Sequence, residues 1–173
     1  MIHLIRHPPV AVAPGVCYGR SDVPLAAPVG PLAEALRARL PARFTLVSSP
    51  LARCRQLAEA LGRPALDARF AEMDFGAWEL RSFDAIGRAA IDAWAADPLH
   101  FRPPGGESVA AMRERALAAL AGWLAEAPGP LVIVSHGGPL RALVGHLLAL
   151  PDDAWPRHPF ATGELQSLPR PPA

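Results

Sequence analysis

Three short, largely apolar runs, each ended abruptly by polar side chains, constrain the fold of this chain more than any other feature. The runs and the residues that follow them are Ile2–Ile5 before Arg6 and His7, Phe44–Val47 before Ser48 and Ser49, and Leu131–Val134 before Ser135 and His136. Such runs are too short for helices and are typical of strands buried on both faces of a parallel sheet. Ligands bind at the carboxyl ends of the strands in an open α/β sheet, so we expect these polar residues to share a site.

Helical patterns separate the runs. Leu32, Leu36 and Leu40 recur every four residues with charged residues between them, which predicts an amphipathic helix. Ser49 suits an N-cap and Pro50 the first helical position, so another helix should begin there and end at Gly62. Further elements are expected as helices over Phe83–Ala96, Glu107–Glu126 and Leu140–Leu148, and as a strand near Glu164–Leu168. We therefore predict a single α/β domain over residues 1–173, a three-layer α/β/α sandwich around a mostly parallel central sheet.

The composition excludes several classes of protein. Hydrophobic residues make up 51% of the 173 residues and charged residues 19%, which excludes intrinsic disorder. The net charge is +1 and no basic stripe is present, so we expect no nucleic-acid partner. The longest apolar stretch, Leu140–Leu150, is interrupted by Arg141 and His146, so we expect no membrane span.

The cysteines and the basic residues narrow the chemistry further. Cys17 and Cys54 offer neither a disulfide framework nor metal-ligand spacing, so we expect free thiols and no metal site. Free thiols, and an N-terminus without a signal-peptide pattern, predict a cytoplasmic protein. The chain has no lysine, and all 17 of its Lys or Arg positions are arginine. Any anion site must therefore use guanidinium groups, histidine or backbone N–H groups.

The residues at the predicted strand ends suit phosphoryl transfer. A neutral His7 imidazole can attack phosphorus, and Arg6 and Arg53 can hold phosphoryl oxygens in bidentate fashion. His136 can add a further donor, as can backbone N–H groups at Gly137 and Gly138 where a helix opens. Phosphoryl transfer depends mainly on positioning and electrostatics, so this set is sufficient without a metal once an acid completes it. Glu72 and Glu79, in an irregular segment, are the candidate acids.

Four motifs of this chain together resemble the histidine phosphatase superfamily, which contains the cofactor-dependent phosphoglycerate mutases and many small-molecule phosphatases. They are Leu4–His7, Ser48–Arg53, Glu72–Glu79 and Ser135–Gly138. The resemblance implies a phosphoglycerate mutase-like fold and a phosphohistidine formed on His7 without a cofactor. It also implies that Arg6, Arg53 and His136 form the phosphate pocket and that Glu72 is the proton donor. The segments Gly19–Leu25 and Asp97–Ser108 look most like the alpha-ribazole phosphatases of cobalamin biosynthesis.

The chain departs from the family pattern just after His7. Pro8, Pro9 and Val10 stand where the family usually has a glycine, an acidic residue and a Thr or Ser, and the chain contains no asparagine. Arg20, or the backbone of residues 16–19, is expected to bind the phosphate in place of those family residues. Leu80 stands where a glycine commonly follows the Trp-Glu pair.

The expected activity is a metal-independent phosphomonoesterase acting on a phosphorylated small molecule, with alpha-ribazole 5′-phosphate as the substrate that the resemblance favours. The other interpretations are a broad small-molecule phosphatase, a phosphoglycerate mutase-like enzyme, and a non-catalytic binder of phosphate ligands. The replacement of the residues after His7 favours the binder, and the retention of a candidate acid favours an enzyme.

Overall fold

A five-stranded sheet forms the centre of the structure, a computed structural model that describes residues 1–171. The strands are β1 (Ile2–Arg6), β2 (Thr45–Ser48), β3 (Ala65–Leu66), β4 (Leu131–Ser135) and β5 (Leu165–Leu168). Their order is β3-β2-β4-β1-β5, with β5 antiparallel to β1 and every other pair parallel. The mostly parallel sheet predicted from the sequence is therefore confirmed.

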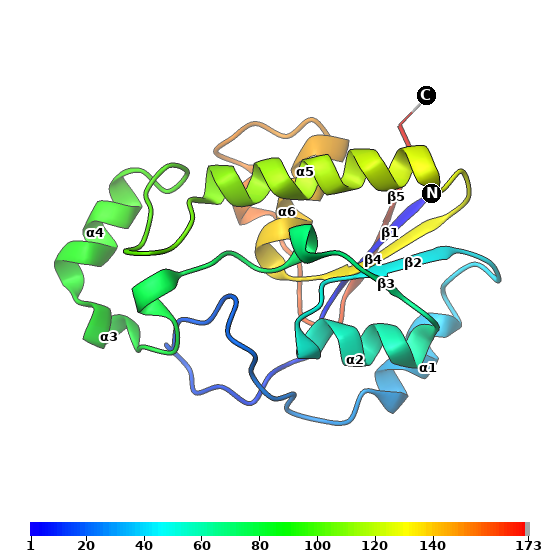
Figure 1. The fold of residues 1–173 in the computed structure, drawn as a ribbon, viewed down its shortest axis with the longest axis horizontal. Helices are drawn as coiled ribbons and strands as arrows, with labels where there is room; N and C mark the ends of the chain where they lie inside the picture. Colours follow the sequence, from blue (N-terminus) through cyan, green and yellow to red (C-terminus); the bar gives the residue numbers. More distant parts are fainter. Residues whose placement is uncertain (172–173) are drawn as a thin grey trace.

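Helices cover both faces of the sheet (Figure 1). The two pairs are α1 (Gly30–Arg37) with α2 (Ala52–Leu61), and α5 (Val109–Glu126) with α6 (Gly137–Leu147). Val132 and Val134 of β4 pack in the core with α1 and α2, while Leu131 and Ile133 pack in the core with α5 and α6. Successive residues of a strand point to opposite faces, so an uninterrupted apolar run supplies both cores and fixes the three-layer arrangement.

The segment Phe83–Ala96 lies beyond the carboxyl ends of the central strands, on the left in Figure 1. The sequence predicted one helix here, and the structure has two, α3 (Phe83–Ile86) and α4 (Arg88–Ala96). Gly87 separates them with a φ of +95°, a conformation that L-residues with a side chain rarely adopt. Neither helix has a buried residue, so this part of the chain contributes little to either core.

Three helix starts differ from those expected, and the smallest difference is that of α5, which begins at Val109 rather than at Glu107. Helix α2 begins at Ala52 with Leu51 as its N-cap; the Ser49 hydroxyl accepts the Leu51 N–H at 3.3 Å and lies 2.8 Å from His136 Nε2, and the Asp22 carboxylate accepts the Ala52 N–H. Helix α6 begins at Gly137, ahead of the predicted start at Leu140. The predicted irregular segment after α2 contains β3 and two short 3₁₀ helices, Ala68–Phe70 and Gly76–Trp78, and a third 3₁₀ helix spans Trp155–Arg157.

Within residues 1–171, none of the helices combines the length and the apolar character that crossing a membrane would require.

Candidate active site

The pairing of β1 with β4 brings two of the sequence motifs together. Arg6 lies opposite Ser135 in the parallel register, so the residues that follow, His7 and His136, leave the sheet side by side. Their ring centroids are 5.2 Å apart. Arg53, from the first turn of α2, is buried against His136. The structure therefore gathers three of the predicted site residues at the carboxyl edge of the sheet.

His7 is held as a neutral imidazole with one free nitrogen. Its side chain is 2% exposed, and Nδ1 lies 2.7 Å from the Pro8 carbonyl oxygen. A carbonyl can only accept, so Nδ1 carries the proton and donates it, which leaves the Nε2 lone pair free. Burial lowers the pKa of His7 to about 4; the bond to Pro8 opposes this shift, and the nearby charges of Arg53 and Arg6 add to it. The imidazole is therefore uncharged at neutral pH, as a nucleophile must be.

Arg53 and His136 lie behind His7 rather than in the cavity wall. Arg53 Nε donates to His136 Nδ1 at 3.2 Å, and the two terminal nitrogens donate to the carbonyl oxygens of Gly19 and Ser21 at 2.5 and 2.9 Å. Because Nδ1 of His136 accepts, its Nε2 carries the proton and donates to Ser49 Oγ. Burial lowers the pKa of His136 well below its ordinary value, and the charge of Arg53 adds to the effect. Both residues lie outside the cavity wall, and the His136 ring packs beside that of His7.

Glu79, one of the two candidate acids, organises a loop. Its carboxylate accepts the backbone N–H groups of Gly19, Arg20, Ser21 and Phe75 at 2.9 to 3.1 Å. Burial acts to raise the pKa of Glu79, but these hydrogen bonds outweigh it and lower the pKa. A carboxylate held ionised in this way, away from the cavity wall, is suited to fixing the backbone rather than to donating a proton.

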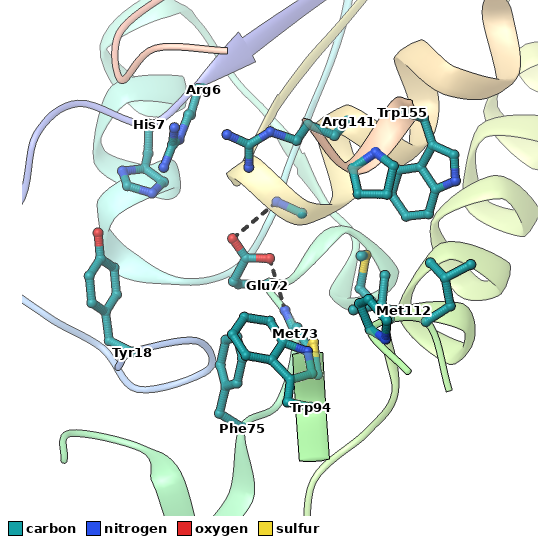
Figure 2. A pocket seen from close by; sticks show the side chains of 15 residues that line it. Arg6, His7, Tyr18, Glu72, Met73, Phe75, Trp94, Met112, Arg141 and Trp155 are labelled. Carbon is teal, nitrogen blue, oxygen red and sulfur yellow. Dashed lines mark hydrogen bonds between the residues drawn. The ribbon is translucent and has the colours of Figure 1, made fainter. Parts of the chain in front are cut away.

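Glu72, the other candidate, faces the nucleophile across a cavity. Its Oε1 accepts the Met73 N–H at 3.0 Å and its Oε2 the Gly138 N–H at 3.3 Å. Figure 2 shows the carboxylate pointing into the space below Arg6, with His7 on one side. Of the two glutamates, Glu72 is the one in a position to exchange a proton with a bound ester.

The cavity has a volume of about 350 Å³ and two chemically different ends. At one end lie the charged and polar groups of Arg6, His7, Glu72, Gly138 and Arg141. The opposite end is apolar, with Phe75, Trp94 and Met112 in its wall, while the Tyr18 hydroxyl points toward His7 and Trp155 lies beside Arg141 (Figure 2). Such a volume and lining are typical of a site for a small molecule that carries one charged group on an apolar body.

Two predicted substrate contacts lie outside the cavity wall. Arg20 is exposed, with its NH1 3.8 Å from Asp74 Oδ2, and does not line the cavity. Gly137 is the first residue of α6 and lies against the Arg6 guanidinium, so close that a Cβ there would stand 3.2 Å from Arg6 Cζ. It therefore makes room for the arginine beside it.

Arg141 lines the cavity, although none of the sequence motifs indicated it. The available signal was helical spacing, because residues four apart lie on one face of a helix. With the helix expected to begin at Leu140, Arg141 could not be placed on one helix face with a residue of the Ser-His-Gly-Gly motif. With the observed start at Gly137, Arg141 lies one turn after a residue of the Ser-His-Gly-Gly motif.

Comparisons with known proteins agree with this geometry. A family model described as histidine phosphatase superfamily (branch 1) matches residues 2–170. The chain belongs to the histidine phosphatase superfamily. The resemblance carried by the four sequence motifs is thereby confirmed, together with the phosphoglycerate mutase-like fold.

Relatives within the superfamily carry different names. The glucosyl-3-phosphoglycerate phosphatase of Mycolicibacterium vanbaalenii is 36% identical over 140 residues, which are 72% of this chain and 61% of that protein. The probable phosphoglycerate mutase GpmB of Salmonella paratyphi C is 33% identical over 168 residues, 89% of this chain and 76% of that one. Among solved structures, the alpha-ribazole phosphatase of Shigella flexneri matches with a TM-score of 0.82 and 28% identity over 95% of this chain and 87% of that chain.

The chain spans less than two thirds of the length of the first of these relatives. Phosphatases are among the named relatives of this superfamily member. The relatives are named for different substrates, so membership alone does not select one.

Proposed function

We propose that this chain hydrolyses a phosphate monoester through a phosphohistidine on His7. The observation that carries the proposal is the cavity in which a neutral His7 faces the Glu72 carboxyl group, with Arg6 beside them. These three groups supply the nucleophile, the acid and a guanidinium for the phosphoryl oxygens.

The reaction follows from the tautomer of His7. Nε2 attacks the phosphorus while the bond to the ester oxygen breaks, and the leaving oxygen takes the proton of the Glu72 carboxylic acid. The Glu72 carboxylate then removes a proton from water, whose oxygen attacks the phosphohistidine. The N–P bond breaks, inorganic phosphate leaves, and both His7 and Glu72 return to their starting states. In this scheme Arg53 and His136 position the His7 ring.

The aromatic end of the cavity supports alpha-ribazole 5′-phosphate as the substrate. The leaving group of this ester is a nucleoside with a flat heteroaromatic base and no charge. Phe75 and Trp94 offer faces and edges on which such a base can pack, and they lie away from Arg6 and Arg141, the two arginines in the cavity wall (Figure 2). A place in cobalamin biosynthesis and a cytoplasmic location belong to the same proposal; Cys17 and Cys54, both buried free thiols, are consistent with a reducing compartment.

A panel of phosphate esters tests this function. We expect alpha-ribazole 5′-phosphate to have a higher kcat/KM than glucosyl-3-phosphoglycerate and 3-phosphoglycerate, with release of inorganic phosphate and no isomer. We expect EDTA to have no effect, and His7→Ala to abolish both turnover and acid-labile protein-bound phosphate.

Three outcomes would contradict parts of the proposal. Full activity of His7→Ala would rule out a mechanism through a phosphohistidine on His7. Formation of an isomer without release of inorganic phosphate would favour a phosphoglycerate mutase-like enzyme. A preference for glucosyl-3-phosphoglycerate, the substrate named for a relative 36% identical to this chain, would keep the reaction and change the substrate.

A further inference from the structure

Several of the donors expected to bind a phosphoryl group near His7 are absent from the cavity wall or engaged elsewhere. Pro8 has no backbone N–H, and its carbonyl is engaged with His7 Nδ1. Both terminal nitrogens of Arg53 donate to loop carbonyls, and Arg20 is outside the cavity. Among the arginines of the sequence motifs, Arg6 is the one that lines the cavity. A doubly charged phosphoryl group calls for more positive charge than one guanidinium provides.

A second guanidinium lies directly beside Arg6. Arg141 Nε donates to the His158 carbonyl oxygen at 2.8 Å, and Arg6 NH1 donates to the Phe160 carbonyl at 2.6 Å, so one short segment fixes both side chains. A Cβ on Gly137 would stand 2.9 Å from Arg141 NH1 and 3.3 Å from Arg6 NH2. The two guanidinium groups therefore pack on the same glycine, and Figure 2 shows them next to each other on the side of the cavity opposite Glu72.

This pair of like charges has no neutralising ion pair. Within residues 1–171, neither Arg6 nor Arg141 has a carboxylate oxygen within 4.0 Å. Arg6 Nε is buried without a hydrogen-bond partner in the same part of the chain. Burial lowers the pKa of Arg141, the charge of Arg6 adds to the effect, and the charge of Glu72 opposes it from beyond ion-pair distance. Two adjacent cations in a partly buried cavity repel each other, and an anion bound between them replaces this repulsion with attraction to both.

We propose that Arg141 is a phosphate-binding residue, and that it holds the transferred phosphoryl group together with Arg6. This role rests on the proposed phosphatase function. The phosphoryl group lies between the His7 Nε2 atom and the two guanidinium groups, and the Glu72 carboxyl group reaches the ester oxygen from the opposite side. Arg141 supplies the donors that the residues after His7 do not.

The same geometry also requires a small residue at position 137. A side chain there would displace one guanidinium or the other, because the Cβ position is tighter against both than ordinary packing allows. Gly137 thus serves the site by letting two arginines approach the same point.

Binding of inorganic orthovanadate, which mimics the phosphoryl group in transfer, tests the role directly. In Arg141→Met the dissociation constant measured by titration calorimetry should rise about 10- to 100-fold, as expected for the removal of a charge-assisted hydrogen bond. Arg141→Gln, which keeps a polar side chain at this half-buried position, is a second variant with the same expectation. Arg157→Met removes an exposed arginine near the same segment and should bind orthovanadate within about twofold of the wild-type protein.

Wild-type affinity for orthovanadate in either Arg141 variant that shows a wild-type circular dichroism spectrum would overturn the proposal. Because this measurement is binding, it decides the role of Arg141 even if the wild-type protein hydrolyses no ester, which would instead contradict the proposed function.

A pair of esters separates the phosphoryl group from the leaving group. Phenyl phosphate carries no charge on its leaving group, whereas 4-carboxyphenyl phosphate carries a carboxylate. If Arg141 binds the phosphoryl group, Arg141→Met lowers kcat/KM for both esters by the same factor. A loss confined to the carboxylated ester would show that Arg141 recognises the leaving group, and would overturn the proposal.

Discussion

His7 shows how one backbone carbonyl and burial together prepare a side chain for chemistry. The Pro8 carbonyl fixes the proton on Nδ1, and burial keeps the ring uncharged. Proline at this position costs a donor and favours an extended conformation for the residue before it, here His7.

The titration of His7 predicts how stability depends on pH. Its pKa falls from 6.5 to about 4 on folding, so between these values the unfolded chain binds a proton that the folded chain does not. The stabilisation is present above pH 6.5 and is lost as the pH falls toward 4. Urea denaturation at pH 7 and pH 4.5 should show a loss of about 2–3 kcal/mol from this residue.

The control for this prediction is His7→Gln, which does not titrate. The fall in the free energy of unfolding between the two pH values should shrink by that amount in the variant. An equal fall in both proteins would mean that His7 titrates alike in the folded and unfolded chains.

Gly138 offers a test of the acid. A Cβ at this position would collide with Glu72 Oε1, so Gly138→Ala should displace the carboxylate and lower kcat at least about tenfold for any ester. Gly122→Ala is the matched control, because Gly122 lies inside α5 with only Arg69 near its Cβ position. That change should raise the free energy of unfolding by about 0.5–1 kcal/mol and leave kcat unchanged. Normal kcat in Gly138→Ala would argue against Glu72 as the proton donor.

At the residue scale, the sequence was enough to predict a reactive side chain that directly follows a strand, as His7 does. It was not enough to predict contacts that depend on the direction in which a side chain points. Arg53 satisfies the same motif as expected, yet its guanidinium turns to the loop carbonyls of Gly19 and Ser21. Arg141 lines the cavity from a helix that starts earlier than its sequence pattern indicated.

Among the elements, the loop at residues 19–21 is held from two sides by opposite charges. The Glu79 carboxylate accepts its N–H groups, while the Arg53 guanidinium donates to its carbonyls and, through Nε, to His136. Gly19 allows this close approach, since a Cβ there would overlap the Met73 carbonyl oxygen. A loop with no regular secondary structure is thereby made part of the support for the nucleophile.

Replacing Glu79 tests this support. In Glu79→Gln the amide NH₂ faces backbone N–H groups, so a donor meets donors, and we expect the free energy of unfolding to fall by about 1–3 kcal/mol. We also expect kcat to fall several-fold while KM changes little, because His136 and His7 lose their alignment but the cavity keeps its lining. Glu59→Gln, at an exposed position paired with Arg55, should change stability by less than about 0.5 kcal/mol. Unchanged kcat in Glu79→Gln would confine the role of this loop to stability.

At this scale the strands were predictable and the helix boundaries were not. An apolar run such as Leu131–Val134 has one physical solution in a chain of this size, a strand buried on both faces. Ser49 and Pro50 are less decisive, because the serine hydroxyl can bond both to a nearby backbone N–H and to a tertiary partner. Here it accepts the Leu51 N–H and also bonds to His136, and the helix begins at Ala52.

For the molecule as a whole, stability is unevenly distributed. Both cores lie against the central strands, whereas α3 and α4 have no buried residue and contact the site through Trp94, whose ring centroid lies 6.3 Å from that of Trp78. Amides of α4 should therefore exchange with deuterium orders of magnitude faster than those of β4.

Binding of a ligand in the cavity should reduce this difference in amide exchange rates. Alpha-ribazole, which carries an aromatic base without phosphate, should slow exchange in α4 more than in α1, since Trp94 lines the cavity and α1 does not. Inorganic phosphate alone should leave α4 unaffected. Equal protection of α1 and α4 by alpha-ribazole would contradict the proposed packing of the base against Trp94.

The two ends of the cavity are built from parts of the chain that contribute differently to the hydrophobic cores. The reactive end is formed at β1 and α6, whose side chains also build the cores, so changes there carry a cost in folding. Trp94 comes from a helix that neither core requires. Substitutions in α4, whether natural or selected in the laboratory, can therefore alter which ester the chain accepts and leave the residues that carry out phosphoryl transfer unchanged.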